Sequence, residues 1–456
     1  MPRKLRVALL AAAAALAFAD SSIVVLGLPE ILARFDAPIG DVAWVVTAYN
    51  LAVAGIALAL ADSVRRIGPG RLCAIGLVTF LIGSIGCAVA GSLGLLIGLR
   101  VVQGTGAAFV LAAALPALAA ATGSYTRGVT IWALASTVGV AVGPAAGGVL
   151  TELFDWRAIF AAQAPVALLA LLAVRGLPPL PPAPVVAAPT RALDRVRANV
   201  GLALVSAGLV GVLFLAVVLL VDAWRRSPLA AALVVSALPL AALAAPRVFR
   251  GLREAAAPAA GAVLLAAGLA ALALVPGTSL GWLIPALILC GLGFGIAVPA
   301  LTGRALLHPR NIAAAGAGSI AARHIGLVVG LLVVTPLLAH DVTAGQQRAT
   351  LLGVSLVLDS PLPVTTKVPL SLDLHRTLRA APAGRIPDFS GPFQTRQQRD
   401  GASPALADLQ QAFTAATTAP IARGFRRSFL AAALLALLAG LPALAAGLAR
   451  LRLRAA

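Results

Sequence analysis

The sequence predicts an all-α transmembrane protein with many spanning helices, and three observations point to this class. Of the 456 residues, 60% are hydrophobic and only 11% are charged, and the mean hydropathy of +0.99 is far above that of soluble domains. Apolar runs of about 18 residues or more recur along most of the chain, and each could cross a bilayer core of about 30 Å as a helix. The arginines lie in short segments between these runs, as topology-determining charges do.

Charged residues, prolines and glycines divide the apolar runs into twelve expected helices. They lie near residues 5–28, 42–61, 71–91, 95–121, 129–151, 157–175, 198–221, 228–246, 256–276, 281–307, 312–340 and 427–449. The proline-rich and then basic stretch GLPPLPPAPVVAAPTRALDRVRA separates the sixth from the seventh. We therefore expect an N-terminal six-helix bundle at residues 1–175, a cytoplasmic linker at 176–197 and a C-terminal six-helix bundle at 198–456.

The basic residues predict the orientation of these helices. Most of them gather in alternate loops on one side, whereas the short loops opposite hold only Arg34, Arg157, Arg225 and Arg226. By the positive-inside rule, both termini and the linker are expected to be cytoplasmic. The net charge of +19 therefore indicates topology and contact with membrane lipids, and nucleic acid is not an expected partner.

The polar segment 341–426, before the last expected helix, faces outward by the same alternation. Apolar residues alternate with polar or small ones at 352–358 and 368–374, which predicts a β-hairpin around Asp359. A short helix is expected from Pro404, with the preceding serine as its cap. The alternative is a partly ordered surface loop.

Very few ionisable residues lie deep inside the apolar runs, where each costs at least about 2.5 to 3.5 kcal/mol. They are Asp20, Arg100, Arg323 and His324. Asp20 could bind and release a proton, with Arg100 as its neighbour, or the two could form a static ion pair that joins two helices. His324 could be a neutral hydrogen-bond partner between helices or a titrating switch.

One apolar run, ALASTVGVAVGPAAGGVL, is rich in small residues. Its glycines are spaced on one helix face, so a neighbouring backbone can approach closely, and its proline should kink the helix. This pattern suits a moving contact, although a tightly packed helix alone would also explain it. The residues are Gly139, Gly143, Pro144, Gly147 and Gly148.

No pattern indicates an enzyme, a cofactor or a metal site. There is no P-loop, no HExxH and no recognisable Ser/His/Asp arrangement. Cys73, Cys87 and Cys290 lie singly in apolar runs without metal-ligand spacing. Residues that could line a substrate cavity are Tyr49, Asn50, Gln103, Arg323 and His324.

With these residues, the sequence resembles the major facilitator superfamily, in particular its drug/proton antiporters, which usually have fourteen spans. ADSSIVVLGLPEI resembles the helix 1 motif, with Asp20 at its acidic position. LRVVQGTGAA places Arg100 and Gln103 on the helix 4 motif that is linked to proton coupling. The glycine run matches the helix 5 antiporter motif, WRAIFAAQAP resembles the WRWIFxxNxP that follows it, and AARHIGLVVG has His324 where glutamine is usual.

Two departures from that branch are visible. The loop motif between helices 2 and 3 occurs only as LALADSVRRIGPGR, with stretched spacing. The residues that survive from it are Asp62, Arg65, Arg66, Gly68 and Arg71. In addition, the two extra central spans are absent, which leaves twelve.

The resemblance implies the major facilitator fold, with two pseudo-symmetric six-helix bundles that give alternating access to a cavity between them. It implies a proton-coupled exporter of hydrophobic or cationic drugs or related amphiphiles, in which Asp20 and Arg100 couple the proton. The glycine motif would seal the contact between bundles, where helix 5 meets helix 8. The protein would be a monomer in a bacterial inner membrane.

Two alternatives remain open. One is a transporter of lipids or amphiphilic metabolites with the same fold and no proton coupling. The other is a non-transporting membrane scaffold that binds a partner through the external segment at 341–426.

Overall fold

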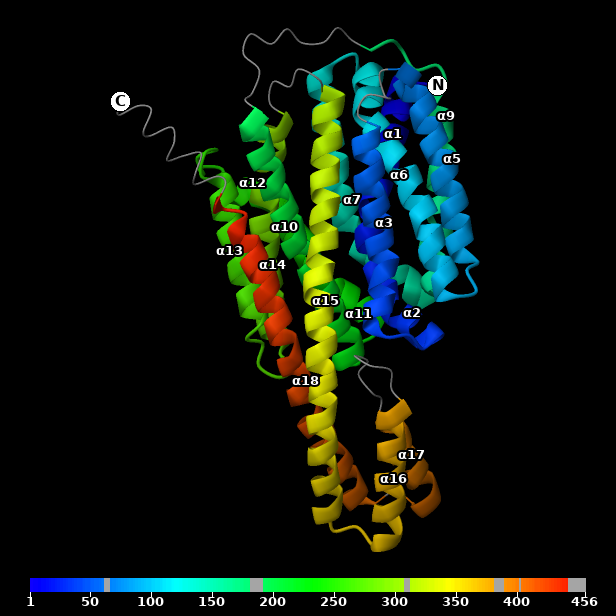
Figure 1. Cartoon of the computed structure of the whole chain (residues 1–456), viewed down its shortest axis with the longest axis vertical. Coiled ribbons are helices and arrows are strands. Elements are labelled where there is room, and N and C mark those ends of the chain that lie inside the picture. Colours follow the sequence, from blue (N-terminus) through cyan, green and yellow to red (C-terminus); the bar gives the residue numbers. More distant parts are fainter. Residues whose placement is uncertain (61–65, 181–191, 307–311, 381–388, 402, 442–456) are drawn as a thin grey trace, which may run out of the picture.

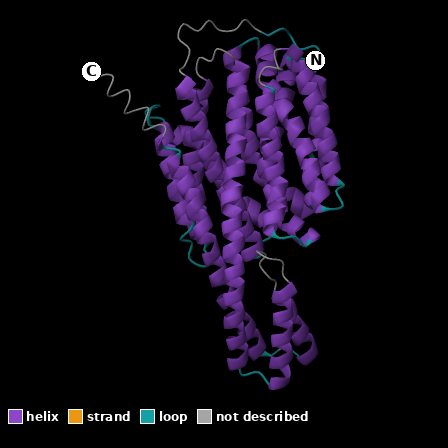
Figure 2. Ribbon diagram, in the orientation of Figure 1, coloured by secondary structure: helices purple, strands orange, loops and turns teal. Residues whose placement is uncertain are grey.

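The computed structural model describes residues 1–60, 66–180, 192–306, 312–380, 389–401 and 403–441 of the chain. All regular structure in these residues is helical, and none of it is strand (Figure 2). The helices form a long bundle from which a smaller helical unit extends at one end, opposite the N-terminus (Figure 1). The all-α prediction is therefore confirmed.

Helices α1 to α9 are called the N-terminal bundle below. They are α1 (Arg3–Ile23), the 3₁₀ turn η1 (Val24–Gly27), α2 (Leu28–Phe35), α3 (Ile39–Ala59), α5 (Pro69–Ala88), α6 (Leu93–Thr122), α7 (Tyr125–Leu153), α8 (Trp156–Ala161) and α9 (Gln163–Val174). Several start at a serine or aspartate whose side chain accepts a backbone N–H, as Ser92 does for α6 and Ser124 for α7. These caps satisfy donors that the first turn leaves free.

The remaining helices are called the C-terminal bundle, together with its extension. They are α10 (Ala192–Val218), the π turn η2 (Leu219–Ala223), α11 (Pro228–Val235), α12 (Ala237–Val248), α13 (Ala257–Leu272), α14 (Leu280–Leu306), α15 (Ile312–Asp359), α16 (Val364–Ala380), α17 (Ser390–Asp400) and α18 (Pro404–Leu438). The two bundles meet where α7 contacts α11 and α12, and where α3 and α6 contact α15.

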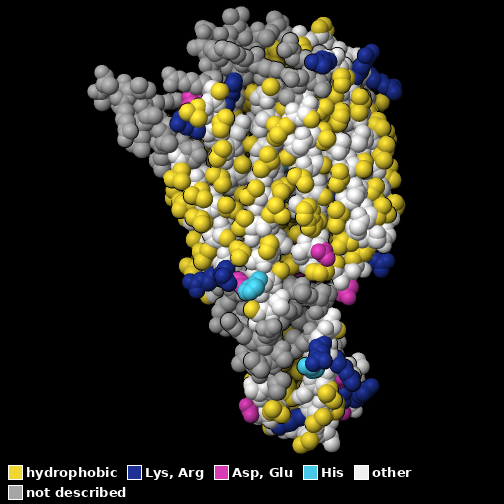
Figure 3. Space-filling model, in the orientation of Figure 1, with side chains coloured by type: hydrophobic (Ala, Val, Ile, Leu, Met, Phe, Trp, Pro, Cys, Tyr) yellow, Lys and Arg dark blue, Asp and Glu magenta, His cyan; other side chains and the backbone are white. Residues whose placement is uncertain are grey.

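Ten helices, or pairs of consecutive helices, are long and apolar enough to cross a membrane within the described residues. The shorter α13 is also apolar, and α18 runs back along α15 into the bundle (Figure 1). Large apolar side chains such as Ile82, Leu134 and Leu233 are more than half exposed. Such side chains cover the flank of the bundle, while lysines and arginines gather near its ends (Figure 3). This is the surface that a lipid environment requires.

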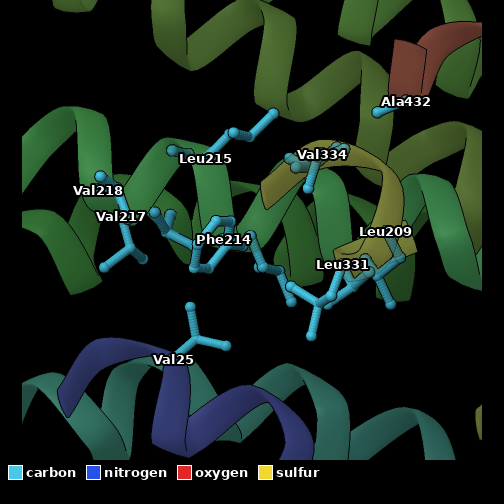
Figure 4. Close-up of a cluster of buried hydrophobic side chains, with 14 of the residues drawn as sticks. Val25, Leu209, Phe214, Leu215, Val217, Val218, Leu331, Val334 and Ala432 are labelled. Carbon is cyan, nitrogen blue, oxygen red and sulfur yellow. The ribbon is translucent and has the colours of Figure 1, made fainter. Parts of the chain in front are cut away.

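An apolar cluster joins the two bundles. Val25 of η1 points towards Phe214, Val217 and Val218 of α10 (Figure 4). Leu331 of α15 belongs to the same cluster. All of these side chains are buried, so apolar packing closes this part of the boundary between the bundles.

The β-hairpin predicted around Asp359 is wrong. Helix α15 is 48 residues long and continues to Asp359, and α16 follows after a short turn. Leu370 and Leu374, four residues apart, are buried, whereas Val368 and Leu372 are more than half exposed. The burial therefore follows the helical period, and the alternation in the sequence places every second apolar residue on the exposed face.

The predicted helix at Pro404 exists and begins as expected, since the Ser403 side chain accepts the backbone N–H of Leu406. It is not short, because it continues as α18 to Leu438 and merges with the last apolar helix. The helix end expected near residue 340 and the helix start expected near residue 427 are also absent, because α15 and α18 are continuous there. Polar residues ended the predicted spans, but outside a bilayer a helix continues readily through polar sequence.

The extension has a small core of its own. Its buried side chains come from α15, α16, α17 and α18, and Phe413 packs edge-on against Phe389 and Phe393 with ring centroids 5.1 and 5.6 Å apart. Beside it, Arg396 of α17 forms an ion pair of 2.7 Å with Asp373 of α16. The extension is therefore a packed helical unit.

Candidate functional site

Asp20 and Arg100 form an ion pair inside the N-terminal bundle. Asp20 lies on α1, Arg100 lies on α6, and their nearest atoms, Oδ2 and Nη1, are 2.5 Å apart. Both side chains are fully buried. Arg100 Nε also donates to the carbonyl of Val45 on α3, at 2.8 Å. A pair this deeply buried keeps both charges only because each is compensated.

Two glutamines complete the surroundings of the pair. Gln163 of α9 donates through Nε2 to Asp20 Oδ1 at 2.8 Å, and Gln103 Nε2 donates to Gln163 Oε1 at 2.7 Å. Arg100 Nη1 donates to Gln103 Oε1 at 2.5 Å, and the hydroxyl of Ser84 on α5 accepts from Gln103 Nε2 at 2.8 Å. The charge pair is thus held by polar groups from four helices.

Tyr49 of α3 closes this network from one side. Its hydroxyl donates to the carbonyl of Ala17 at 2.7 Å, and the Arg100 guanidinium lies 4.2 Å from the centre of its ring. Phe160 contributes a second aromatic ring, 5.6 Å from the same guanidinium. The aromatic faces favour the cation and keep the pair in an apolar shell.

A chain of hydrogen bonds leads from this region to the other bundle. Ser21, which follows Asp20 on α1, donates to Asn50 Oδ1 at 2.9 Å, and His324 Nδ1 of α15 lies 2.7 Å from the same oxygen. Asn50 Nδ2 donates to the carbonyl of Val46 at 2.8 Å, which fixes the orientation of the amide. Because Asn50 Oδ1 can only accept, His324 Nδ1 carries the proton and donates.

Arg323 makes a second polar contact between the bundles. Its Nη1 donates to Ser136 Oγ of α7 at 2.9 Å, and its guanidinium lies 4.8 Å from the ring centre of Phe18 on α1. The side chain is nine-tenths buried. Arg323 and His324 are therefore adjacent residues of α15 that contact α7 and α3 of the other bundle.

A small cavity of about 30 Å³ lies at this boundary. Its walls come from α1, α7, α10, α14 and α15. The lining residues are Phe18, Ser21, Ser22, Val140, Ser206, Leu209, Val210, Leu213, Phe294, Arg323, His324 and Leu327. The volume suits a water molecule, so in this conformation the bundles are closed around the site.

The glycines of α7 divide between two neighbours. A side chain at Gly139, Gly143 or Gly147 would meet α1, at Ala15, Ser22 and Ile23 respectively. At Gly148 it would meet Ala232 and the Pro228 carbonyl of α11, in the other bundle. Among these glycines, Gly148 is therefore the one at the contact between bundles, and Pro144 lies within the continuous helix α7.

The candidate cavity residues also divide into two groups. Arg323 and His324 line the cavity, and Asn50 contacts His324. Tyr49 and Gln103 lie instead in the network around the ion pair. Of the loop motif, Arg66 and the N-cap residue Gly68 lie just before α5, Arg71 lies in its first turn, and all three are separate from both groups. Asp62 and Arg65 lie outside the described residues.

Sequence reasoning did not assign Gln163, Ser84 or Ser136 to the site. Gln163 stands where the WRWIFxxNxP pattern has asparagine, so an amide in an apolar helix was the available indication. Nothing in the sequence distinguishes Ser84 and Ser136 from other serines in apolar helices, because a serine there commonly bonds to its own helix.

This chain is similar to known transport proteins. A family model described as Major Facilitator Superfamily matches residues 10–331. The multidrug resistance protein Stp of Mycobacterium tuberculosis (strain CDC 1551 / Oshkosh) is 34% identical over 155 residues, which are 33% of this chain and 29% of that protein. The riboflavin transporter RibZ of Clostridioides difficile (strain 630) is 32% identical over 152 residues, 33% of each chain. The matched segments thus span a third or less of these curated relatives.

Among solved structures, a bacterial homologue of the human lysosomal transporter Spinster, in an inward-facing and occupied conformation, superposes with a TM-score of 0.66. The alignment covers 98% of this chain and 97% of that chain, at 16% sequence identity. At this identity the likeness shows a shared fold alone.

Proposed function

The chain belongs to the Major Facilitator Superfamily, and from this premise we propose that it is a proton-coupled secondary transporter that exports amphiphilic small molecules by antiport. The protein works in a bacterial plasma membrane, with both termini and the linker in the cytoplasm and the helical extension outside. It functions as a monomer. The drug-resistance relative supports export, and the basic loops support this orientation.

The observation that carries the proposal is the buried pair of Asp20 and Arg100. A proton on Asp20 neutralises the carboxylate and removes its attraction to Arg100, although the guanidinium keeps its charge. Arg100 Nη2 has no hydrogen-bond partner among the described residues. The guanidinium can therefore donate a further hydrogen bond when Asp20 is protonated. The pair therefore has two states that differ in charge by one proton.

The change at Asp20 reaches the boundary between bundles through its neighbour. Ser21 shares the acceptor Asn50 Oδ1 with His324, so a shift of α1 at Asp20 alters the bond that joins α3 to α15. Protonation from outside then favours one opening of the bundles, and release inside favours the other. One charge crossing 100 mV is worth about 2.3 kcal/mol, which is enough to drive export against a gradient.

The test uses purified full-length protein in proteoliposomes with an imposed pH gradient and a fluorescent amphiphile as substrate. Asp20→Asn keeps the size of the side chain and removes the titrating group, so we expect gradient-driven transport to be lost. The matched control is Asp41→Asn, which changes an exposed carboxylate at the start of α3. Gradient-driven transport by Asp20→Asn at the wild-type rate would overturn the proton role.

A second candidate function is transport of a lipid or amphiphilic metabolite without proton coupling. The packed extension formed by α15, α16, α17 and α18 favours it, because it provides an external surface that the antiport mechanism does not use. Deletion of residues 350–420 would then abolish transport, and collapse of the pH gradient would not. Absence of any flux in either preparation would instead favour a scaffold.

A further inference from the structure

The cavity between the bundles contains positive charge and no carboxylate. Among its lining residues, only Arg323 and His324 are ionisable. Asp20 precedes the lining residue Ser21, but its negative charge is compensated by Arg100 within the N-terminal bundle. The electrostatic character of the cavity is therefore set by the guanidinium of Arg323.

Arg323 and Arg100 are both buried arginines, but they differ in what compensates them. Arg100 has the carboxylate of Asp20 at 2.5 Å. For Arg323 the described residues provide the hydroxyl of Ser136 and the face of Phe18, and no ion pair with a carboxylate. A neutral hydroxyl and an aromatic face compensate a buried guanidinium much less than a carboxylate does.

Resting on the proposed function, we propose that Arg323 binds the acidic head group of the transported molecule, so that the substrates are amphiphiles carrying a carboxylate, sulfonate or phosphate. A guanidinium presents paired N–H donors that match the two oxygens of such a group. The apolar part of the molecule packs on Phe18, Leu213 and Phe294, which line the same cavity. This narrows the substrate class and disfavours the cationic drugs named from the resemblance.

The charge of the site explains this preference. A cationic substrate would meet the charge of Arg323 in a region of low dielectric, where no lining carboxylate offsets the repulsion. An acidic head group supplies the counter-charge that Arg323 lacks. Neutral amphiphiles gain the apolar contacts but not the ion pair.

Binding requires the cavity to enlarge. At about 30 Å³ it holds water but no amphiphile. The acidic group would take the place of Ser136 Oγ at Arg323 Nη1, which releases a contact between α15 and α7. Substrate binding and separation of the bundles on this side are thus the same event.

The experiment uses three dansyl probes with the same eight-carbon chain, ending in a carboxylate, a primary amide or an amine. Binding to the full-length protein in detergent is measured by equilibrium dialysis, and transport is measured in proteoliposomes. The variants are Arg323→Gln and Arg323→Lys, and the control is Arg34→Gln, which removes an exposed arginine at the end of α2. Monodisperse gel filtration identifies the variants that fold.

We expect wild-type protein and Arg34→Gln to bind the carboxylate probe at least tenfold more tightly than the amide, and the amine most weakly. Arg323→Gln should bind carboxylate and amide within about twofold of each other, and Arg323→Lys should keep part of the preference. Equal binding of carboxylate and amide by the wild type overturns the inference even if neither variant folds, as does a preference that survives in Arg323→Gln.

The two measurements separate this inference from the proposed function. Carboxylate-selective binding that depends on Arg323, without transport of any probe, supports the anion site and argues against export. Gradient-driven transport of the amide and amine at the rate of the carboxylate supports export and rejects the anion site.

Discussion

Asn50 on α3 and His324 on α15 share a hydrogen bond of 2.7 Å that crosses from one bundle to the other. Asn50 is fully buried and His324 is 2% exposed, so water does not compete for either group. In the closed conformation this bond therefore helps to hold the bundles together.

Replacing His324 with alanine should loosen the closed state. The change leaves Asn50 Oδ1 with Ser21 as a donor but removes the bond across the boundary. We expect a loss of about 1–3 kcal/mol from the closed conformation and a shorter lifetime of that state. The measurement is a distance distribution between spin labels on α3 and α15.

Two further variants give this prediction its controls. His324→Gln retains an amide donor and should stay close to the wild-type distribution. His375→Ala alters an exposed histidine of α16 and should have no effect. A His324→Ala distribution indistinguishable from that of His375→Ala would mean that the bond contributes nothing to closure.

The ion pair of Asp20 and Arg100 predicts strongly non-additive stability effects. Arg100→Met removes the counter-charge and leaves a buried carboxylate, which costs about 3–5 kcal/mol. In the double variant Asp20→Asn/Arg100→Met no charge remains, so the loss should be smaller than the sum of the two single losses. The measurement is the free energy of unfolding in denaturant for the detergent-solubilised wild type, both single variants and the double variant, which together form a double-mutant cycle. Additive losses would contradict a compensated pair.

Two adjacent glycines of α7 should respond differently to enlargement. In Gly148→Leu the new side chain meets Ala232 of α11, so we expect the contact between bundles to open and transport to jam without loss of the fold. In Gly147→Leu it meets the backbone of Ile23 within the same bundle, so we expect destabilisation by about 1–3 kcal/mol or more.

The control for both variants is Gly98→Leu on α6, where an added Cβ has no heavy atom within 4 Å. Thermal unfolding and transport are measured on the same preparations. Equal thermal stability of Gly147→Leu and Gly148→Leu would argue against the division between neighbours that the structure gives.

The sequence was sufficient to predict most of the spanning helices, because bilayer thickness sets their length and the apolar runs meet that length regardless of their fine pattern. It also predicted the pair of Asp20 and Arg100, since isolated charges in apolar helices require partners. Gln163 and Ser136 escaped prediction because an uncharged polar residue in a spanning helix has many possible partners, and only the packing of α9 and α7 selects one.

The extension was mispredicted for a different reason. At residues 368–374 the apolar residues recur every second position, and a subset of them, Leu370 and Leu374, also satisfies the helical spacing of four. The sequence pattern thus permitted both structures. Packing favours the helix over the strand, since the helical form brings these leucines together with Phe393 and Phe413 in one core.

That core gives the last prediction. Phe413 is 1% exposed and lies against Phe389 and Phe393, so Phe413→Ala should destabilise the extension by about 3–5 kcal/mol through lost burial and the cavity it leaves. The control is Leu358→Ala in the same unit, whose side chain is 61% exposed and should cost little. Limited proteolysis of the purified full-length protein measures the effect. We expect rapid cleavage of Phe413→Ala within residues 359–413 while the membrane helices remain protected, because those helices have a separate apolar core. Equal cleavage rates for the two variants would mean that Phe413 does not stabilise the extension as this packing requires.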